Sequence, residues 1–508
     1  MRSFEATALL VFFVEPYFSS GFTLPRSPGD RQHVRDPPIS TVDIQNDDKR
    51  PTPYDTSSEF NDSDCELVGI LSNLEGLSVE DIVQDLDGLP LSKEYLSESM
   101  GVNVESYTCP EKDAFRGFMS NACRIRVSPG GETAFYKRIV FEHLGHAWEK
   151  LKTAPFKLAR DAKSYQVVAS FLSSKACQQL TKQTGVCIPK CYDAQLRPND
   201  SNPIESKYSF LLEDFSSSDG WYQQWLLDDD EECKATLKAF AKIHAFFWNG
   251  SKFWNDKEAA EELEAAVWKS GSYVQPEAQN TETVNQCKIV AKEWATKRLR
   301  FEKELSSFDY WDNLGERLES VAEQCGRDAH PFADDTLSEA YKKYRTFTHG
   351  DPKQANLFFR RDSAGSELQV GLIDYQWSGF GLAATDIAHF LTSAVHADRL
   401  VDGGESLLQQ YYYGELQKYL VEYGAFSSKD EATENFSFET FTEQYEIAVL
   451  DICRLMIAYT WSRFEEAVEK SDHEACARTM NKTSYNKSIP NIMWLMSRCD
   501  EILKSRGV

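Results

Sequence analysis

A short stretch in the C-terminal half of the chain, "FTHGDPKQANLFF", concentrates side chains that could do chemistry. It holds His349, Asp351 and Asn356 in the spacing H-x-D-x4-N, and the apolar residues that follow predict a strand. A second apolar stretch, "LQVGLID", ends at Asp374, eighteen positions after Asn356. If the two stretches pair as a hairpin, Asp374 returns beside the loop. The sequence therefore predicts that three oxygen-bearing side chains, those of Asp351, Asn356 and Asp374, converge.

These side chains suit phosphoryl transfer. Magnesium takes oxygen ligands and is commonly held by one or two protein groups together with nucleotide phosphates. The reaction also needs a carboxylate that orients and deprotonates the attacking hydroxyl. The spacing H-x-D-x4-N, followed by a hairpin and a second Asp, is typical of the catalytic loop and metal site of kinases. Taken alone, the pattern can also arise by chance in a chain of 508 residues.

Earlier segments supply phosphate-binding candidates in the order that a kinase requires. Lys137, in "AFYKRI", can reach nucleotide phosphates, although a lone strand lysine is more often solvated. Ser120 and Asn121 begin "SNACRIRV", where a phosphate-covering loop is expected. Gly117 is the nearby glycine, so this loop lacks the G-x-G-x-x-G pattern and would have to rely on the backbone amides of Ser120 and Asn121.

A nucleotide-binding hinge is predicted where the strand pattern gives way to helices. The stretch "FLLEDF" ends at this point, and the backbone groups of Glu213 and Phe215 could hydrogen-bond to adenine. The alternative is an ordinary buried strand end.

The elements that position these residues fall into two halves. "LSVEDIVQDL" and "LSKEYLSESMG" predict short helices, each opened by a serine cap. "ACRIRVS" and "TAFYKRIVF", joined at Pro129-Gly130-Gly131, predict a hairpin, and two later strands follow one helix, "KLARDAKSYQVVASFLSSKAC". After Phe215 the pattern is helical, with one hairpin at the catalytic stretch. The predicted fold class is α+β.

Five motifs together resemble a known superfamily: "FYKRI", "FLLEDF", "KAFAKIHAFFW", "THGDPKQANLFF" and "LIDYQWSGFGLAATDIAHFL". They are similar to the choline kinases and aminoglycoside phosphotransferases, and within these to the ecdysteroid kinase-like, or CHK kinase-like, proteins, from about residue 89 to the C-terminus. The resemblance implies a bilobal protein kinase-like fold with an N-lobe over residues 66–214 and a C-lobe over 215–508. It implies an ATP- and Mg²⁺-dependent kinase that phosphorylates a hydroxyl of a small molecule, since Gly350 matches the family where protein kinases carry Arg.

The resemblance also implies roles for the candidate residues. Asp351 would be the catalytic base, and His349 would brace the catalytic loop. Lys137, Ser120 and Asn121 would bind the phosphates. Glu213 and Phe215 would contact adenine. Asn356 and Asp374 would bind the metal. Asp386, in "AATDIAHF", is expected to cap its helix and tie it to the catalytic loop, and Gln376 matches a family position.

One position departs from the family pattern. Relatives carry a Glu on the N-lobe helix that pairs with the phosphate-binding lysine, and "KSYQVVASFL" has Val168 there. Either Lys137 pairs with another carboxylate, such as Asp161, or it has no partner. The second case would leave a nucleotide-binding pseudo-enzyme or scaffold as the alternative function.

The first 65 residues differ from the rest. Arg2, an apolar run over residues 6–14 and the small residues that follow have the order of a secretory signal peptide, and "SSGFTLP" resembles the junction of plastid-targeting leaders. The alternative is a disordered tail on a cytoplasmic protein, because residues 25–63 are rich in Pro, Asp, Ser and Arg. The apolar run is too short to span a bilayer, and no later segment is long enough, so no membrane span is expected.

The composition of the chain limits which partners and metal sites are expected. A formal net charge of −25 and a pI near 4.9 oppose binding to nucleic acid, which needs a broad basic face. The twelve cysteines, including Cys187 and Cys191, are scattered and indicate reduced core thiols. His143 and His146 in "HLGH" lack an evident third ligand for zinc.

Two further features have alternative readings. The acidic run at residues 228–232 predicts a solvated helix start, or a surface that attracts a cationic acceptor. Most of the following four tryptophans are expected to pack in the core, although lining an acceptor pocket, with cation–π contact to a quaternary ammonium, is an alternative: Trp221, Trp225, Trp248 and Trp254.

Overall fold

The computed structural model describes residues 83–110, 114–116, 120–273, 286–306, 308–362, 366–458 and 488–508. The predicted leader, most of the first predicted helix and Gly117 lie outside the described residues. Residues 83–86, the described end of that helix, are not helical, and Gln84 instead forms a bridge with Pro90. The second predicted helix is confirmed as α3 (Lys93–Met100). Its cap is Ser92, whose hydroxyl accepts a hydrogen bond from the Tyr95 amide.

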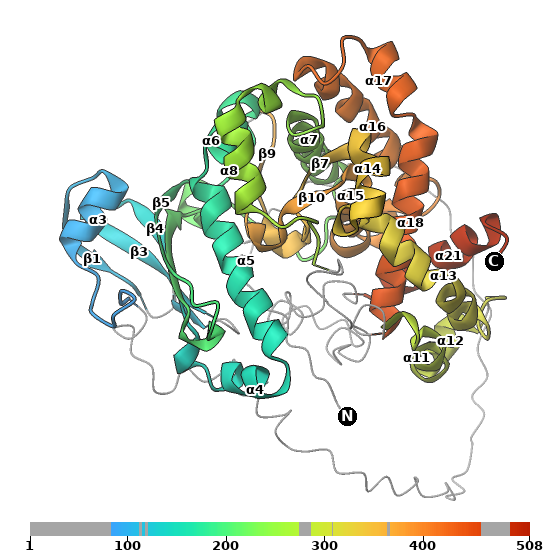
Figure 1. The fold of residues 1–508 in the computed structure, drawn as a ribbon, viewed down its shortest axis with the longest axis horizontal. Helices are drawn as coiled ribbons and strands as arrows, with labels where there is room; N and C mark the ends of the chain where they lie inside the picture. The colour runs from blue at the N-terminus through green and yellow to red at the C-terminus, as the bar shows by residue number, and fades with distance from the viewer. Residues whose placement is uncertain are drawn as a thin grey trace, which may run out of the picture. The chain divides into compact units, whose positions relative to one another are not determined.

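An antiparallel sheet forms the N-lobe, which we define as β1 to β6 with helices α3 to α6 (Figure 1). The predicted hairpin is confirmed: β3 and β4 pair antiparallel, and Gly131 at the turn has a φ of 81°. The strand order is β1-β3-β4-β6-β5, with β2 also paired to β3. The strands are β1 (Val104–Thr108), β2 (Ala114–Arg116), β3 (Asn121–Pro129), β4 (Thr133–Val140), β5 (Cys191–Arg197) and β6 (Lys207–Glu213).

Alternation along the strands separates two apolar layers. Cys123 and Tyr136 face α3, whereas Ala122 and Phe135 face α5 (Pro155–Ser173) and the main core. The single helix predicted after β4 is wrong in one respect, because Ser174 ends α5 and caps a second helix, α6 (Lys175–Thr184). A further short helix, α4 (Gly145–Thr153), precedes α5.

The C-lobe, from α7 onward, is mostly helical and contains two small sheets. The predicted hairpin is confirmed as β8 (Leu357–Arg360) paired with β9 (Gln369–Leu372), and β7 (Arg345–Thr348) pairs with β10 (Gly379–Leu382). The described C-lobe helices are α7 (Asp230–Phe246), α8 (Lys257–Ala266), α11 (Val290–Lys297), α12 (Glu302–Leu305), α13 (Leu314–Ala329), α14 (Asp335–Tyr341), α15 (Ala383–Ala394), α16 (Gly404–Glu422), α17 (Lys429–Asn435), α18 (Phe438–Ala458) and α21 (Ile489–Ser505). The predicted α+β class, strands first and helices after, is confirmed.

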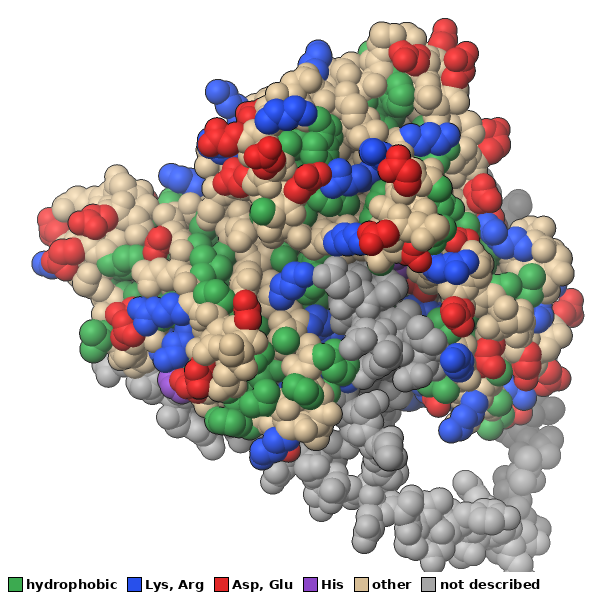
Figure 2. Space-filling view, in the orientation of Figure 1, with side chains coloured by type: hydrophobic (Ala, Val, Ile, Leu, Met, Phe, Trp, Pro, Cys, Tyr) green, Lys and Arg blue, Asp and Glu red, His purple; other side chains and the backbone are tan. Residues whose placement is uncertain are grey.

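The acidic run at residues 228–232 begins α7, as predicted. Asp229 caps the helix by accepting a hydrogen bond from the Glu231 amide. The expectation of a fully solvated run is wrong at Glu232, which is buried and accepts a hydrogen bond from the Tyr222 hydroxyl. On the face shown in Figure 2, acidic and basic side chains of the described residues are interspersed.

Within the described ranges, none of the helices has the length and apolar character needed to cross a membrane. The ten cysteines in these ranges are free thiols, and seven of them are buried. The same ranges contain no group of three or more His, Cys, Asp or Glu residues placed to hold a metal ion.

Candidate active site

The catalytic stretch forms a loop between β7 and β8, and its turn depends on a glycine. Gly350 has a φ of 82°, and a Cβ added there would lie 2.2 Å from the carbonyl oxygen of Trp377. Any larger residue would therefore collide with backbone as well as adopt a left-handed conformation. This close approach gives a physical reason for glycine at the position where the family resemblance also expects it.

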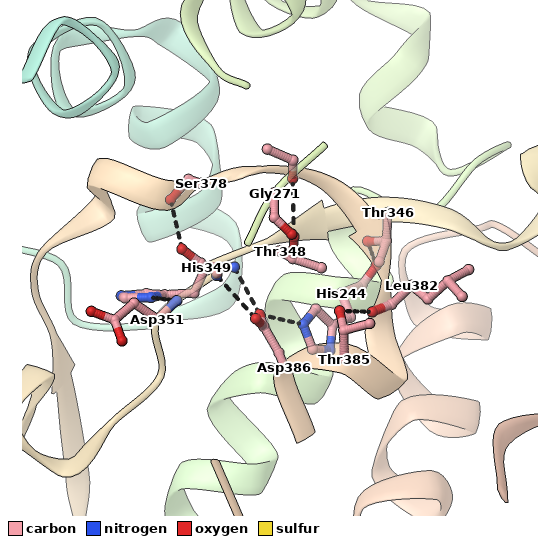
Figure 3. A network of polar contacts seen from close by, with 12 residues as sticks. His244, Gly271, Thr346, Thr348, His349, Asp351, Ser378, Leu382, Thr385 and Asp386 are labelled. Atoms are coloured by element: carbon pink, nitrogen blue, oxygen red, sulfur yellow. Dashed lines mark hydrogen bonds and ion pairs between the residues drawn. The ribbon is translucent and has the colours of Figure 1, made fainter. Parts of the chain in front are cut away.

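Asp386 ties helix α15 to this loop (Figure 3). Its carboxylate accepts hydrogen bonds from the amides of His349, at 2.7 Å, and Gly350, at 3.0 Å, and lies 3.2 Å from Nε2 of His244. Burial alone would raise the pKa of Asp386, but these donors hold it below its usual value. The predicted tie is confirmed. The predicted cap is wrong, because no side chain caps α15.

His349 braces the loop from within. Its Nε2 lies 2.9 Å from the carbonyl oxygen of Ile373, and its Nδ1 accepts a hydrogen bond from the Asp351 amide at 3.3 Å. These contacts assign the ring proton to Nε2. Burial lowers the pKa of His349, so the ring is neutral near pH 7. The arrangement links the catalytic loop to the strand that ends before Asp374, as expected for a bracing residue.

Asp351 is buried and has a cationic neighbour that the sequence analysis missed. Nζ of Lys353 lies 2.5 Å from Oδ2 of Asp351, and Nε2 of His389 lies 3.5 Å from Oδ1. Burial alone would raise the pKa of Asp351, but Lys353 and His389 lower it overall. Asp351 is therefore ionised at neutral pH, the state that a general base needs. The only sequence signal for Lys353 was its position two residues after Asp351.

Asp374 and Asn356 provide the oxygens that a divalent cation would need. Among the described residues, both carboxylate oxygens of Asp374 and Oδ1 of Asn356 are buried without a hydrogen-bond partner. The amide Nδ2 of Asn356 donates to the carbonyl oxygen of Asp351 at 2.8 Å, which fixes the side chain. The backbone carbonyl of Asn356 also accepts a hydrogen bond from the Ile373 amide, so the two candidate ligands lie on adjacent backbone. These residues fit Mg²⁺, because uncompensated hard oxygens are its preferred ligands.

The backbone at Asp374 is also unusual. Its φ of 67° and ψ of 62° place it in the left-handed region, which non-glycine residues adopt rarely and often at functional sites. Burial raises the pKa of Asp374, an effect that Lys137 and Lys353 oppose. A carboxylate held in this state gains most when a cation binds.

Lys137 lies on β4 with its ammonium group buried. Its Nζ is 4.8 Å from the centre of the Tyr165 ring on α5, and burial lowers its pKa while Asp374 opposes that change. The predicted alternative partner, Asp161, is wrong, because Asp161 is already paired with Lys150 and Arg160. The electrostatic partner of Lys137 is Asp374.

Several of the predicted residues line a cavity of about 760 Å³, a volume that includes space open to solvent. Glu213 is the last residue of β6, Phe215 follows two residues later, and both line the cavity. The predicted residues in the cavity wall are Lys137, Val168, Glu213, Phe215 and Asp374. Ser120 and Asn121 are not among the lining residues and lie at the start of β3, where Asn121 pairs with Arg138 on the lysine-bearing strand. A cavity of this size suits a nucleotide.

The tryptophans predicted to pack in the core do so. Trp221 and Trp248 are buried, and Trp225 and Trp254 are partly buried against the main core. Trp221 stacks on Phe215, and the indole nitrogen of Trp254 donates to backbone carbonyls. Their contacts are therefore within the protein.

The sheet order, the braced catalytic loop and the cavity beside it define a protein of the kinase-like class. Residues 159–424, more than half of the chain, match the ecdysteroid kinase-like family. The chain belongs to this family, and the resemblance seen in the motifs is confirmed.

Similar solved structures include an ethanolamine kinase of Plasmodium vivax, with 12% identity and a TM-score of 0.34, over 86% of this chain and 98% of that one. They also include an aminoglycoside phosphotransferase of Alicyclobacillus acidocaldarius, with 13% identity and a TM-score of 0.32, over 77% and 92% of the two chains. A microcompartment-associated aminopropanol kinase has 12% identity and a TM-score of 0.30, over 72% and 87%. The comparison with curated proteins gave no match.

Proposed function

We propose that the protein transfers the γ-phosphoryl group of ATP to a hydroxyl of a small molecule, with Mg²⁺ as cofactor. The observation that carries this proposal is the set of buried oxygens without hydrogen-bond partners, on Asp374 and Asn356, beside an ionised Asp351. Such oxygens are costly to bury unless a ligand completes them. Membership of the ecdysteroid kinase-like family supports a small-molecule acceptor.

Residues in and beside the catalytic loop would have separate roles in the reaction. Asp351 would accept the proton of the attacking hydroxyl, and its lowered pKa keeps it unprotonated for that step. Despite burial, the carboxylates of Asp351 and Asp374 both attract the ammonium group of Lys353 and raise its pKa. Lys353 would bind the transferred phosphoryl group. When bound, Mg²⁺ would be held by Asn356 and Asp374 and would neutralise charge on the phosphates.

Lys137, which lines the cavity from β4, would contact the phosphates. The missing glutamate at position 168 does not leave it without support, because the Tyr165 ring and the Asp374 charge flank its ammonium group. A buried lysine with a lowered pKa regains its charge when phosphate oxygens approach. This arrangement favours an active enzyme over the pseudo-enzyme alternative.

A metabolite screen tests the proposal. Purified protein is incubated with Mg·ATP and pools of hydroxyl compounds, and ATP consumption is measured against the Asp351→Asn variant. We expect at least one pool to stimulate ATP consumption by the wild type and not by the variant. Binding of Mg·ATP without stimulation by any pool would support the pseudo-enzyme alternative. Equal consumption by both proteins would show that Asp351 is not the base.

A further inference from the structure

The hinge end of the cavity carries an ion pair that the phosphate-transfer chemistry does not use. Nε of Arg124 on β3 lies 2.5 Å from Oδ2 of Asp214, and its Nη2 lies 3.1 Å from Oδ1. Both side chains line the cavity, and both are largely withdrawn from solvent, at 16% and 4% exposure. A two-point contact of this kind fixes the plane of the guanidinium group as well as its position.

The sheet register explains why the Arg124 side chain enters the cavity. Arg124 lies directly opposite Phe135 on β4, and both face the cavity, whereas Cys123 and Ile125 face the other layer. At the hinge, Glu213 bonds instead to the Lys190 amide through its Oε2 at 3.0 Å. The next side chain, that of Asp214, points toward Arg124 on β3.

Apolar side chains form much of this end of the cavity. Its walls include Phe135, Leu212, Phe215, Phe358 and Ile373. A flat aromatic base fits between such walls, and a fixed guanidinium plane can stack on its face. A purine presents a larger π-face for this contact than a pyrimidine does.

We propose that Arg124, held flat by Asp214, contacts the nucleobase and selects purine nucleotides. This inference rests on the proposed function, because it assumes that the cavity binds a nucleotide. Arg124 acts as a specificity-determining residue, and Asp214 is a positioning residue that acts through it. The phosphates would lie near Lys137 and Asp374, which line the same cavity.

Calorimetric binding of three ligands in the presence of Mg²⁺ tests the proposal: ADP, UDP and pyrophosphate. The main variant is Arg124→Leu combined with Asp214→Asn, which removes the pair without leaving a buried charge unpaired. The matched control is Arg197→Leu combined with Asp87→Asn, an exposed ion pair in the N-lobe whose residues are not in the cavity wall. Arg124→Lys is a second variant that keeps the charge but loses the flat, two-point contact.

We expect the wild type to bind ADP about 10-fold or more tightly than UDP, and the main variant to lose most of that preference. Its pyrophosphate affinity should stay within about threefold, because the phosphate end is unchanged. Arg124→Lys should lose ADP affinity in the same direction, and the control pair should bind as the wild type does. If the main variant does not fold, Arg124→Lys alone decides the test.

An unchanged ratio of ADP to UDP affinity in Arg124→Lys or in the main variant would overturn the inference. Equal weakening of ADP, UDP and pyrophosphate would also overturn it, because it would show that the pair only holds the lobe together. If the wild type binds pyrophosphate and ADP equally, the base contributes nothing and the inference fails while the proposed function stands. If the wild type binds none of the three, the proposed function itself fails.

Discussion

Two buried aspartates near the catalytic loop are expected to respond in opposite ways to the same substitution. Asp386 accepts hydrogen bonds from two loop amides and faces His244, whereas the carboxylate oxygens of Asp374 have no hydrogen-bond partner among the described residues. If Asp374 is kept for a cation, Asp374→Asn should remove the Mg²⁺-dependent part of nucleotide binding and leave stability nearly unchanged. Asp386→Asn should instead destabilise the fold.

The contacts of each carboxylate set the size of both changes. Replacing the Asp386 carboxylate removes an acceptor from a charge-assisted network, which costs about 3–5 kcal/mol when one buried partner is lost. At Asp374 two effects oppose each other, because relief from burying a charge offsets the lost attraction to Lys137. We expect a net change within about 1 kcal/mol. Asn is chosen over Ala because it tolerates the left-handed backbone at this position.

Thermal unfolding with and without Mg·AMP-PNP measures both properties. A ligand at 100 times its dissociation constant stabilises by about 2.7 kcal/mol, which raises the Tm of a folded chain of this size by about 3 °C. Asp374→Asn should keep the unliganded Tm and lose the part of the shift that depends on Mg²⁺. Asp386→Asn should lower the unliganded Tm by several degrees. A Mg²⁺-dependent shift that survives in Asp374→Asn, together with a lower unliganded Tm, would refute the reasoning.

Substitutions at three other positions test neighbouring parts of the site. Asp351→Asn should lower turnover by about 10²–10⁴-fold with Mg·AMP-PNP affinity within a few-fold of wild type, and a large loss of nucleotide affinity would assign it to the metal instead. Lys353→Met should lower turnover strongly while Lys353→Arg retains part of it, and equal activity of Lys353→Met and wild type would exclude contact with the transferred group. Val168→Glu should leave nucleotide affinity within about threefold, because Asp374 already supports Lys137; a rise of 10-fold or more over the neutral Val168→Gln would show that Lys137 lacks a partner.

The parts of the site that sequence could predict are those fixed by local spacing. The catalytic loop and hairpin hold Asp351, Asn356 and Asp374 within one continuous segment, so their convergence follows from one turn and one strand pair. The end of β6 at Glu213, where we propose that adenine binds, also follows from a change of pattern along the chain.

The parts that sequence could not predict depend on contacts between distant segments. Lys137 and Asp374 meet only after the two lobes pack, and nothing in the spacing distinguishes Asp374 from Asp161 as the electrostatic partner. His389 reaches Asp351 from α15 in the same way. The break between α5 and α6 was missed for a different reason, because Ser174 lies in an otherwise helical pattern and its capping role competes with continuation of the helix.

Crystals of the protein with Mn²⁺ and AMP-PNP would test the central claim most directly, since anomalous scattering locates the metal. We expect a metal peak between Oδ1 of Asn356 and the carboxylate of Asp374, with phosphate oxygens toward Lys137 and Lys353. We also expect a free path from the γ-phosphate to Asp351. A nucleotide bound in another cavity, or a metal held by residues other than Asn356 and Asp374, would show that the proposed site is wrong.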